Sequence, residues 1–259
     1  MAASQPFFQW SYVTGQWSQI SSDLLQHIAL SLLSLGIGLV VSEPLALVAW
    51  RFRPLRTFVV GLASGLYIIP SLALFAILGP ITGYVASYPT ALIALVGYTL
   101  LILIWNTMAG LDAVPAETRE AATAFGYTPT ARLLRVDFPL ALPYVFAGLR
   151  VASATVIGLV TVTALIGLGG LGQQITYGFN IGFYTPIIVG LVLSVALAAL
   201  CDLLLVGIER LVLPWKRSGR AVFLRIGRPA RTPLGAVAGS VGGGDGGGGG
   251  PVEAETGTA

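Results

Sequence analysis

Charged residues, histidine and cysteine are all scarce in this sequence. Only 10% of its residues are Asp, Glu, Lys or Arg, whereas 55% are hydrophobic. A soluble globular domain carries about 25% charged residues, so the composition excludes that class. The single histidine, His27, and the single cysteine, Cys201, exclude a His/Cys metal cluster and an intramolecular disulfide.

Catalytic and nucleotide-binding signatures are missing as well. The sequence contains no G-x-x-x-x-G-K-[ST] motif, so we expect this chain to bind neither ATP nor any other cofactor. The segment 167–172 satisfies G-x-G-x-x-G but follows a long apolar run, whereas a dinucleotide site needs a strand and a βαβ unit. No nucleophile motif accompanies His27, which disfavours an intramembrane protease. We therefore expect a protein that is not an enzyme, with no catalytic and no metal-binding residues.

What the sequence has in abundance is long apolar segments. A bilayer core about 30 Å thick needs roughly 20 apolar residues in a helix, and only helices or closed barrels satisfy the backbone in lipid. No Lys or Arg precedes Arg51, so the first apolar segment lacks a signal peptide's basic region and is expected to be retained. The predicted fold is all-α and polytopic, with five transmembrane helices at 27–50, 57–79, 90–111, 144–165 and 186–212.

The basic residues lie on one side of this five-span arrangement. Lys and Arg concentrate in cytoplasmic loops, and the predicted outer segments 1–26, 80–89 and 166–185 contain none. Four or six spans would place a basic segment outside. We therefore predict a multi-pass protein of the bacterial cytoplasmic (inner) membrane, with the N-terminus outside and the C-terminus in the cytoplasm. The fourteen basic residues are Arg51, Arg53, Arg56, Arg119, Arg132, Arg135, Arg150, Arg210, Lys216, Arg217, Arg220, Arg225, Arg228 and Arg231.

Two end segments flank the transmembrane domain, which is predicted to occupy 27–213. The outer segment 1–26 is rich in aromatic residues, which favour the membrane interface. The segment 214–259 begins basic and becomes Gly-rich. Its apolar content is too small to offset the entropy of ordering, so we predict a disordered cytoplasmic tail whose basic part contacts anionic lipid.

The loop 112–143, between the third and fourth spans, carries the most specific pattern. Pro115 suits the first turn of a short helix, and Gly126 suits its left-handed C-terminal cap. Thr128 can cap a second helix that begins at Pro129. Pro139 and Pro143 are expected to break the backbone before the fourth span. The loop is thus predicted to project two short helices from the inner face, with Phe125 as an apolar anchor.

This loop resembles the EAA loop of ABC importer permeases. The resemblance rests on Glu120-Ala121-Ala122, three residues, Gly126, nine residues, Val136, one residue and Phe138-Pro139. The family pattern has Ile and Leu where this chain has Val136 and Phe138. In that family the loop forms a coupling helix that docks on an ATPase subunit. The resemblance assigns ATPase coupling to Glu120, Ala121, Ala122, Phe125, Gly126, Val136, Pro139 and Pro143. A generic amphipathic loop, with Glu120 paired to Arg119 or Arg132, is the alternative.

Further segments are similar to the osmoprotectant branch of the family, which transports glycine betaine, choline and carnitine. They are Ile69–Leu74, Asn106-Thr107, Ala147–Ala152 and Leu165–Gly172. The resemblance covers about 27–213 and implies a type I (MetI-like) permease core that works by alternating access. Its implied partners are ABC ATPase subunits holding ATP and Mg, an extracytoplasmic solute-binding protein and a second permease chain. Membrane lipid surrounds it, and no nucleic acid is expected.

Three sets of residues are left with two interpretations each. Aromatic faces bind quaternary ammonium groups, so some membrane aromatic and polar residues are candidates for the translocation path, with helix packing as the alternative. The glycines of 167–172 predict either an outer gate or a helix-breaking outer loop. Glu43 and Asp202 either pair with inner-face arginines or belong to the path. The path candidates are Tyr67, Pro70, Ser71, Tyr98, Trp105, Asn106 and Thr107; the gate candidates are Gly167, Gly169, Gly170 and Gly172.

Two other functions stay open on the sequence alone. A permease of the same architecture could transport another small solute, such as an amino acid. A channel or membrane scaffold independent of ATP is the alternative from another class, and it would not need the loop pattern around Gly126.

Overall fold

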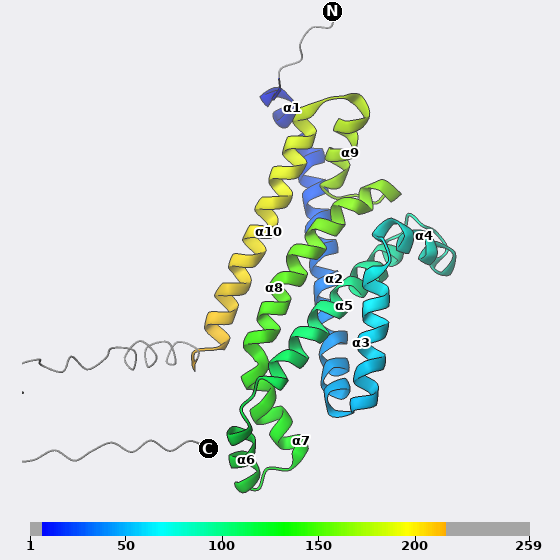
Figure 1. The fold of residues 1–259 in the computed structure, drawn as a ribbon. Helices are drawn as coiled ribbons and strands as arrows, with labels where there is room; N and C mark the ends of the chain where they lie inside the picture. Colours follow the sequence, from blue (N-terminus) through cyan, green and yellow to red (C-terminus); the bar gives the residue numbers. More distant parts are fainter. Residues whose placement is uncertain (1–6, 216–259) are drawn as a thin grey trace, which may run out of the picture. The chain divides into compact units, whose positions relative to one another are not determined.

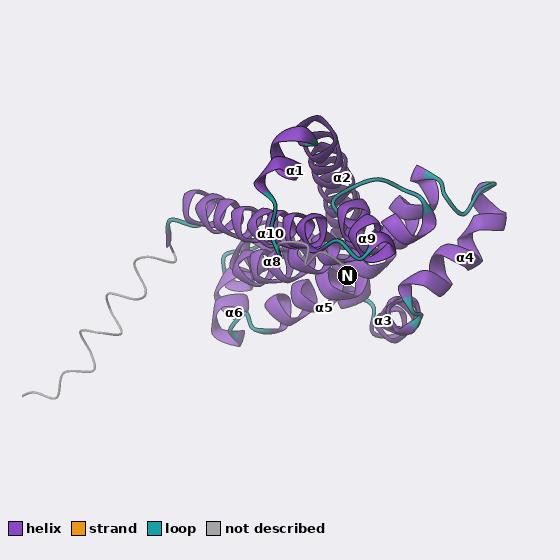
Figure 2. Cartoon of the chain, turned by 90° about the horizontal axis from the view of Figure 1, so that it is seen from above, coloured by secondary structure: helices purple, strands orange, loops and turns teal. Residues whose placement is uncertain are grey.

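The computed structural model describes residues 7–215, and these residues form helices and connecting loops without a strand (Figures 1 and 2). Contacts divide the chain into Met1–Pro214 and Trp215–Ala259, and the fold below is that of the first unit. The predicted tail lies outside the described residues. The elements are α1 (Trp10–Gly15), α2 (Trp17–Arg51), α3 (Arg53–Ile68), α4 (Ser71–Thr82), α5 (Tyr88–Asp112), α6 (Ala116–Ala124), α7 (Pro129–Arg132), η1 (Leu133–Asp137), α8 (Phe138–Thr163), η2 (Ala164–Ile166), α9 (Gly172–Ile181) and α10 (Tyr184–Val212).

Four described helical segments are long and apolar enough to cross a membrane: α2, α5, the run Pro129–Ile166 and α10. The predicted second span is broken instead of continuous. Its halves, α3 and α4, meet at an angle of 105°, and α4 extends sideways from α3 (Figure 2). The count of five spans holds if this bent pair is one span.

Proline chemistry explains the break between α3 and α4. Pro70 cannot donate a backbone hydrogen bond, and Ile69 before it adopts extended torsion angles, as residues preceding proline do. The Tyr98 hydroxyl on α5 donates to the carbonyl of Ile69. The acceptor released by the break is thereby satisfied within the membrane.

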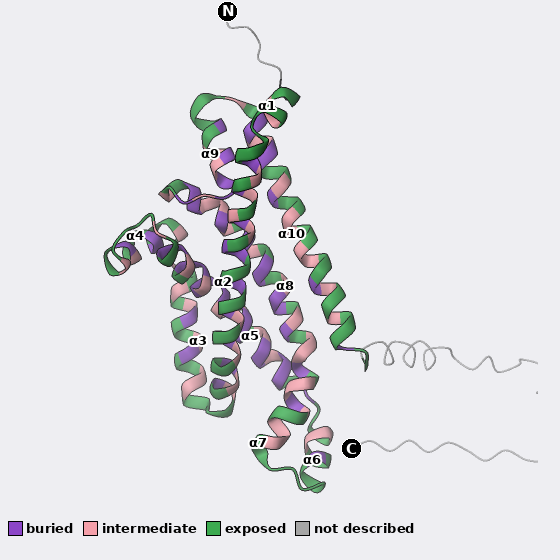
Figure 3. Cartoon of the chain, turned by 180° about the vertical axis from the view of Figure 1, so that it is seen from behind, coloured by how far each residue is buried: buried purple, intermediate pink, exposed green. Residues whose placement is uncertain are grey.

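Helix α5 is the core of the bundle. In its most apolar window 56% of residues are buried, against 11% in α10, and the same contrast is visible in Figure 3. Lipid tails are as apolar as Leu, so packing between membrane helices depends on small residues that allow close approach. Gly148 of α8 packs on Asn106 of α5, where a Cβ would lie 2.7 Å from the Asn106 Cβ.

Helix α2 begins at Trp17, well before residue 27, where the first span was predicted to start. With 35 residues it is about 52 Å long, which exceeds the ~30 Å hydrocarbon core. A span counted from Arg51 therefore ends before the first turns of α2, and those turns belong to the polar end of the helix.

Candidate functional site

The loop between α5 and α8 folds locally much as its sequence predicts. Helix α6 begins after Pro115, which is its N-cap. It ends at Ala124, and Gly126, two residues later, has a left-handed φ of 82°. The Tyr127 N–H donates back to the Ala122 carbonyl at 3.2 Å, which is the hydrogen-bond pattern of a glycine cap. The Thr128 hydroxyl accepts from the Ala131 N–H at 3.3 Å and caps α7 as predicted.

The predicted break at Pro139 and Pro143 is wrong. Helical structure runs without interruption from Pro129 to Ile166. The segment η1 is a π-helix, in which the Phe138 N–H donates to Leu133, five residues earlier. This wider turn lies directly before Pro139, which cannot donate. Local π adjustments of this kind allow proline inside a membrane helix.

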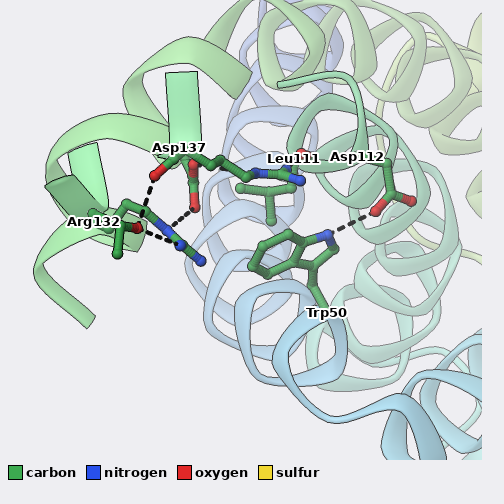
Figure 4. Close-up of polar contacts among 7 residues, drawn as sticks. Trp50, Leu111, Asp112, Arg132 and Asp137 are labelled. Atoms are coloured by element: carbon green, nitrogen blue, oxygen red, sulfur yellow. Dashed lines mark hydrogen bonds and ion pairs between the residues drawn. The ribbon is translucent and has the colours of Figure 1, made fainter. Parts of the chain in front are cut away.

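A buried carboxylate joins the two short helices to the membrane-spanning part. Asp137 is fully buried, and its two oxygens lie 3.4 Å from Arg119 Nε of α6 and 3.5 Å from Arg132 Nε of α7 (Figure 4). Neither contact has hydrogen-bond geometry, so Asp137 is held by charge alone. The Asp137 carboxylate, at the start of α8, thus attracts both α6 and α7.

Arg119 also connects α6 to the ends of α2 and α5. Its guanidinium lies over the Trp50 ring at 5.3 Å and donates to the Leu111 carbonyl. The Trp50 indole N–H donates to Asp112 at 2.7 Å (Figure 4), and Arg56 binds the other oxygen of Asp112 at 2.9 Å. Cation–π contacts of this kind contribute about 0.5–1 kcal/mol at exposed sites. Displacement of α6 would therefore act directly on α2, α5 and the start of α8.

The predicted coupling residues separate into an exposed set and a set within the helix. Glu120, Ala121, Phe125 and Gly126 are exposed, and Phe125 is 84% exposed. Ala122 is the buried residue of α6. Val136, Pro139 and Pro143 are half-buried in the helical run that leads into α8. An apolar ring this exposed at a helix end is available to a partner protein.

Asp137 was not recognised in the sequence as a residue of this site. Arg119 and Arg132 were considered as partners of Glu120, but the structure pairs both with Asp137. The available signal was an acidic residue standing alone between apolar residues at the entrance of a span, since such a residue is buried only with a partner.

The predicted path residues do not form one surface. Tyr67 and Tyr98 meet edge to face at 5.8 Å beside the break at Pro70 and Ser71. Trp105, 58% exposed, lines a separate cavity of about 410 Å³ near Asp112.

The remaining two path candidates are occupied by contacts within the bundle. The Asn106 amide donates to the Ile102 carbonyl at 2.8 Å. The Thr107 hydroxyl donates to Glu43 Oε1 at 2.9 Å. Among the two acids left open, Glu43 thus binds a hydroxyl instead of an arginine, whereas Asp202 forms a bidentate pair with Arg150 at 2.5 and 2.9 Å.

The glycine segment 167–172 lies at the end of the bundle opposite α6 (Figure 1). Gly167 and Gly170 have φ values of 82° and 93°, which side chains rarely adopt. A Cβ at Gly169 would overlap Gln26 of α2, and one at Gly172 would overlap the Thr161 carbonyl of α8. The segment is therefore a tightly packed turn between α8 and α9.

His27 of α2 holds this turn against α8. The ring is fully buried. Nδ1 accepts from the Leu171 N–H at 3.2 Å, so the hydrogen sits on Nε2 and is donated to the Ile157 carbonyl, 3.0 Å away. Residue type alone does not predict this contact, because both partners are backbone groups distant along the chain.

Three comparisons with known proteins agree with this geometry. Residues 22–214 match the family described as "Binding-protein-dependent transport system inner membrane component". The osmoprotectant import permease protein OsmW of Salmonella typhimurium is 33% identical over 206 residues, which are 78% of this chain and 96% of that protein. The choline transport system permease protein OpuBB of Bacillus subtilis is 35% identical over 191 residues, 73% of this chain and 86% of that protein.

A solved structure has the same fold. The MetNI methionine ABC transporter, in an inward-facing conformation, contains a chain that superimposes with a TM-score of 0.66 at 23% identity. The match covers 74% of this chain and 95% of that one. The predicted all-α, MetI-like permease fold is confirmed.

Proposed function

This chain belongs to the family of inner-membrane components of binding-protein-dependent transport systems, and on that premise we propose that it is the permease of an ATP-driven importer of compatible solutes. The substrate class is glycine betaine, choline, carnitine or proline betaine. The observation that carries the substrate class is the similarity to an osmoprotectant and a choline permease over about three quarters of the chain.

In the proposed mechanism the chain supplies the conduit and its partners supply energy and selectivity. A solute-loaded binding protein docks on the outer face. ATP and Mg, held by separate ATPase subunits, drive closure of those subunits beneath α6. Arg119 and Asp137 carry the displacement of α6 to α2, α5 and α8, and a second permease chain completes the pore.

The proposed orientation places the N-terminus outside and the loop 112–143 in the cytoplasm. All eight described arginines lie from Arg51 onward, and none lies in α1, α9 or the first turns of α2. This one-sided distribution supports the orientation, because Lys and Arg concentrate on the cytoplasmic side.

Uptake of labelled solutes tests the substrate class. The chain is expressed with its ATPase and binding-protein partners in cells that lack their own betaine and choline uptake systems, at high osmolarity. We expect ATP-dependent glycine betaine or choline uptake, unaffected by excess methionine. Uptake of methionine or another amino acid without betaine or choline uptake would favour the amino-acid alternative. Uptake that persists without the ATPase would favour a channel.

A further inference from the structure

A polar cavity of about 300 Å³ is lined by residues of α1, α2 and α9 and of the link between α1 and α2. These helix ends lie at the end of the bundle away from α6 (Figure 1). This volume is at the lower end of the range for small-molecule pockets. No aliphatic side chain lines it, unlike the apolar grooves between the other helices. Its lining residues are Tyr12, Gln16, Gln19, Asp23, Gln173, Gln174 and Tyr177.

Asp23 gives this cavity an uncompensated negative charge. The side chain is 1% exposed. Its oxygens accept from two neutral amides, Gln19 Nε2 at 2.9 Å and Gln174 Nε2 at 2.6 Å. Within residues 7–215 no arginine or lysine pairs with it, since the ion pairs there involve Asp112, Asp137 and Asp202. Buried carboxylates are ordinarily paired with a cation, so this one is suited to receive a cation from a ligand.

The hydrogen bonds around Asp23 determine which groups in the cavity donate and which accept. The Tyr12 hydroxyl donates to Gln174 Oε1 at 2.8 Å, so the other end of that amide must face Asp23 as a donor. Burial raises the pKa of Tyr12, and Tyr177 and Asp23 raise it further. The phenol therefore stays protonated at neutral pH, and its ring remains an electron-rich neutral surface.

The two tyrosines complete a site for a cation without N–H groups. A quaternary ammonium cannot donate hydrogen bonds and is recognised by aromatic faces together with nearby negative charge. Tyr12 comes from α1 and the half-exposed Tyr177 from α9. Asp23 lies in the first two turns of α2, beyond a ~30 Å span counted from Arg51, so the cavity lies at the level of water and headgroups.

We propose that this cavity binds the quaternary ammonium end of the solute, as a low-affinity station between the binding protein and the pore. This inference rests on the proposed function for the identity of the solute. Choline, which carries net positive charge, fits the cavity better than glycine betaine, whose own carboxylate is repelled by Asp23.

Direct binding to the purified full chain in lipid nanodiscs tests the station. Saturation-transfer NMR follows the methyl signal of choline, with 3,3-dimethyl-1-butanol as its uncharged isostere. We expect saturable binding of choline and none of the isostere. Asp23→Asn is expected to weaken binding about tenfold or more, and Tyr177→Ala about threefold. Tyr84→Ala, on an exposed ring outside the cavity, should leave binding unchanged.

Three outcomes would overturn the station. They are no choline binding to the wild-type chain, equal binding of the isostere, or unchanged binding in both cavity variants. If Asp23→Asn misfolds, Tyr177→Ala decides alone. Because this assay contains neither ATPase nor binding protein, failure here with intact cellular uptake rejects the station and leaves the proposed function standing. Loss of binding-protein docking in Asp23→Asn, without choline binding to the wild type, would assign the cavity to a protein contact instead.

Discussion

Among single residues of the loop 112–143, Asp137 connects the short helices α6 and α7 to the start of α8. Its side chain is fully buried, whereas the side chains of its partners Arg119 and Arg132 are 25% and 28% exposed. Because neither contact is a hydrogen bond, the arrangement can tighten or loosen with small movements of α6. Removal of the carboxylate leaves two cations close together without their counter-charge.

We predict that Asp137→Asn loosens the loop. Loss of charge partners for groups that are largely buried costs about 1–3 kcal/mol, so hydrogen exchange in 116–137 should accelerate roughly tenfold or more. The measurement is hydrogen–deuterium exchange by mass spectrometry on the purified chain. Asp112→Asn is the matched control, because its pair with Arg56 is 39% and 46% exposed and exposed pairs contribute little. Equal acceleration in both variants would contradict the role given to Asp137.

At the scale of residues, helix caps could be predicted from the sequence, whereas contacts of buried polar side chains could not. Gly126 and Thr128 were placed correctly because caps depend on a few adjacent residues. The contacts of Asp137 were not, because more than one acid of the loop could pair with Arg119 and Arg132. Those of His27 were not, because its partners are backbone groups 130 and 144 residues away. A residue's type shows that it needs a partner, but only the fold shows which one.

At the scale of elements, the contact between α5 and α8 depends on glycines. A Cβ at Gly148 would meet Asn106 Cβ at 2.7 Å, and one at Gly110 would lie 2.9 Å from the Ala141 carbonyl. Both distances are below van der Waals contact. The helices therefore approach more closely than any other residue at these positions would allow.

Gly148→Ala is accordingly expected to destabilise the bundle. Overpacking of a tight contact costs about 1–3 kcal/mol, less the helix propensity that alanine gains, which is up to about 1 kcal/mol. Thermal unfolding in detergent should show a lower Tm. Gly158→Ala, on the same helix but with no atom within 4 Å of the added Cβ, should leave Tm unchanged or raise it. A Tm loss of the same size in Gly158→Ala would show that the contact with Asn106 is not the cause.

Element boundaries were predictable where hydrophobic length decided them. The expected 90–111 and 186–212 spans match α5 and α10 closely. Prolines were interpreted less well, since Pro70 breaks its span by 105° whereas Pro143 lies inside α8. At the break, the Tyr98 hydroxyl satisfies the free Ile69 carbonyl, and at the entrance to α8 the wider turn of η1 precedes Pro139.

For the whole molecule, the orientation in the membrane follows from charge. A membrane-impermeant maleimide can test it in a Cys201→Ser background. Cysteines at the exposed positions Ser11 and Thr130 report on opposite ends of the bundle. We expect Ser11→Cys to be labelled in intact spheroplasts and Thr130→Cys only after permeabilisation. The reverse pattern would contradict the N-out orientation.

The central claim is that the exposed end of α6 engages an ATPase that drives transport. Phe125 is 84% exposed and makes no contribution to the core, so Phe125→Asp should fold normally while it removes an apolar contact with the partner. Phe179→Asp is the matched control, because Phe179 is 70% exposed on α9 at the opposite end.

The most direct measurement combines co-purification of the ATPase with solute uptake for these two variants. The account predicts that Phe125→Asp reduces both at least tenfold, which corresponds to about 1.4 kcal/mol of docking free energy. It predicts that Phe179→Asp retains ATPase co-purification at the wild-type level. Normal ATPase binding and uptake in Phe125→Asp, with both variants equally inserted in the membrane, would contradict it.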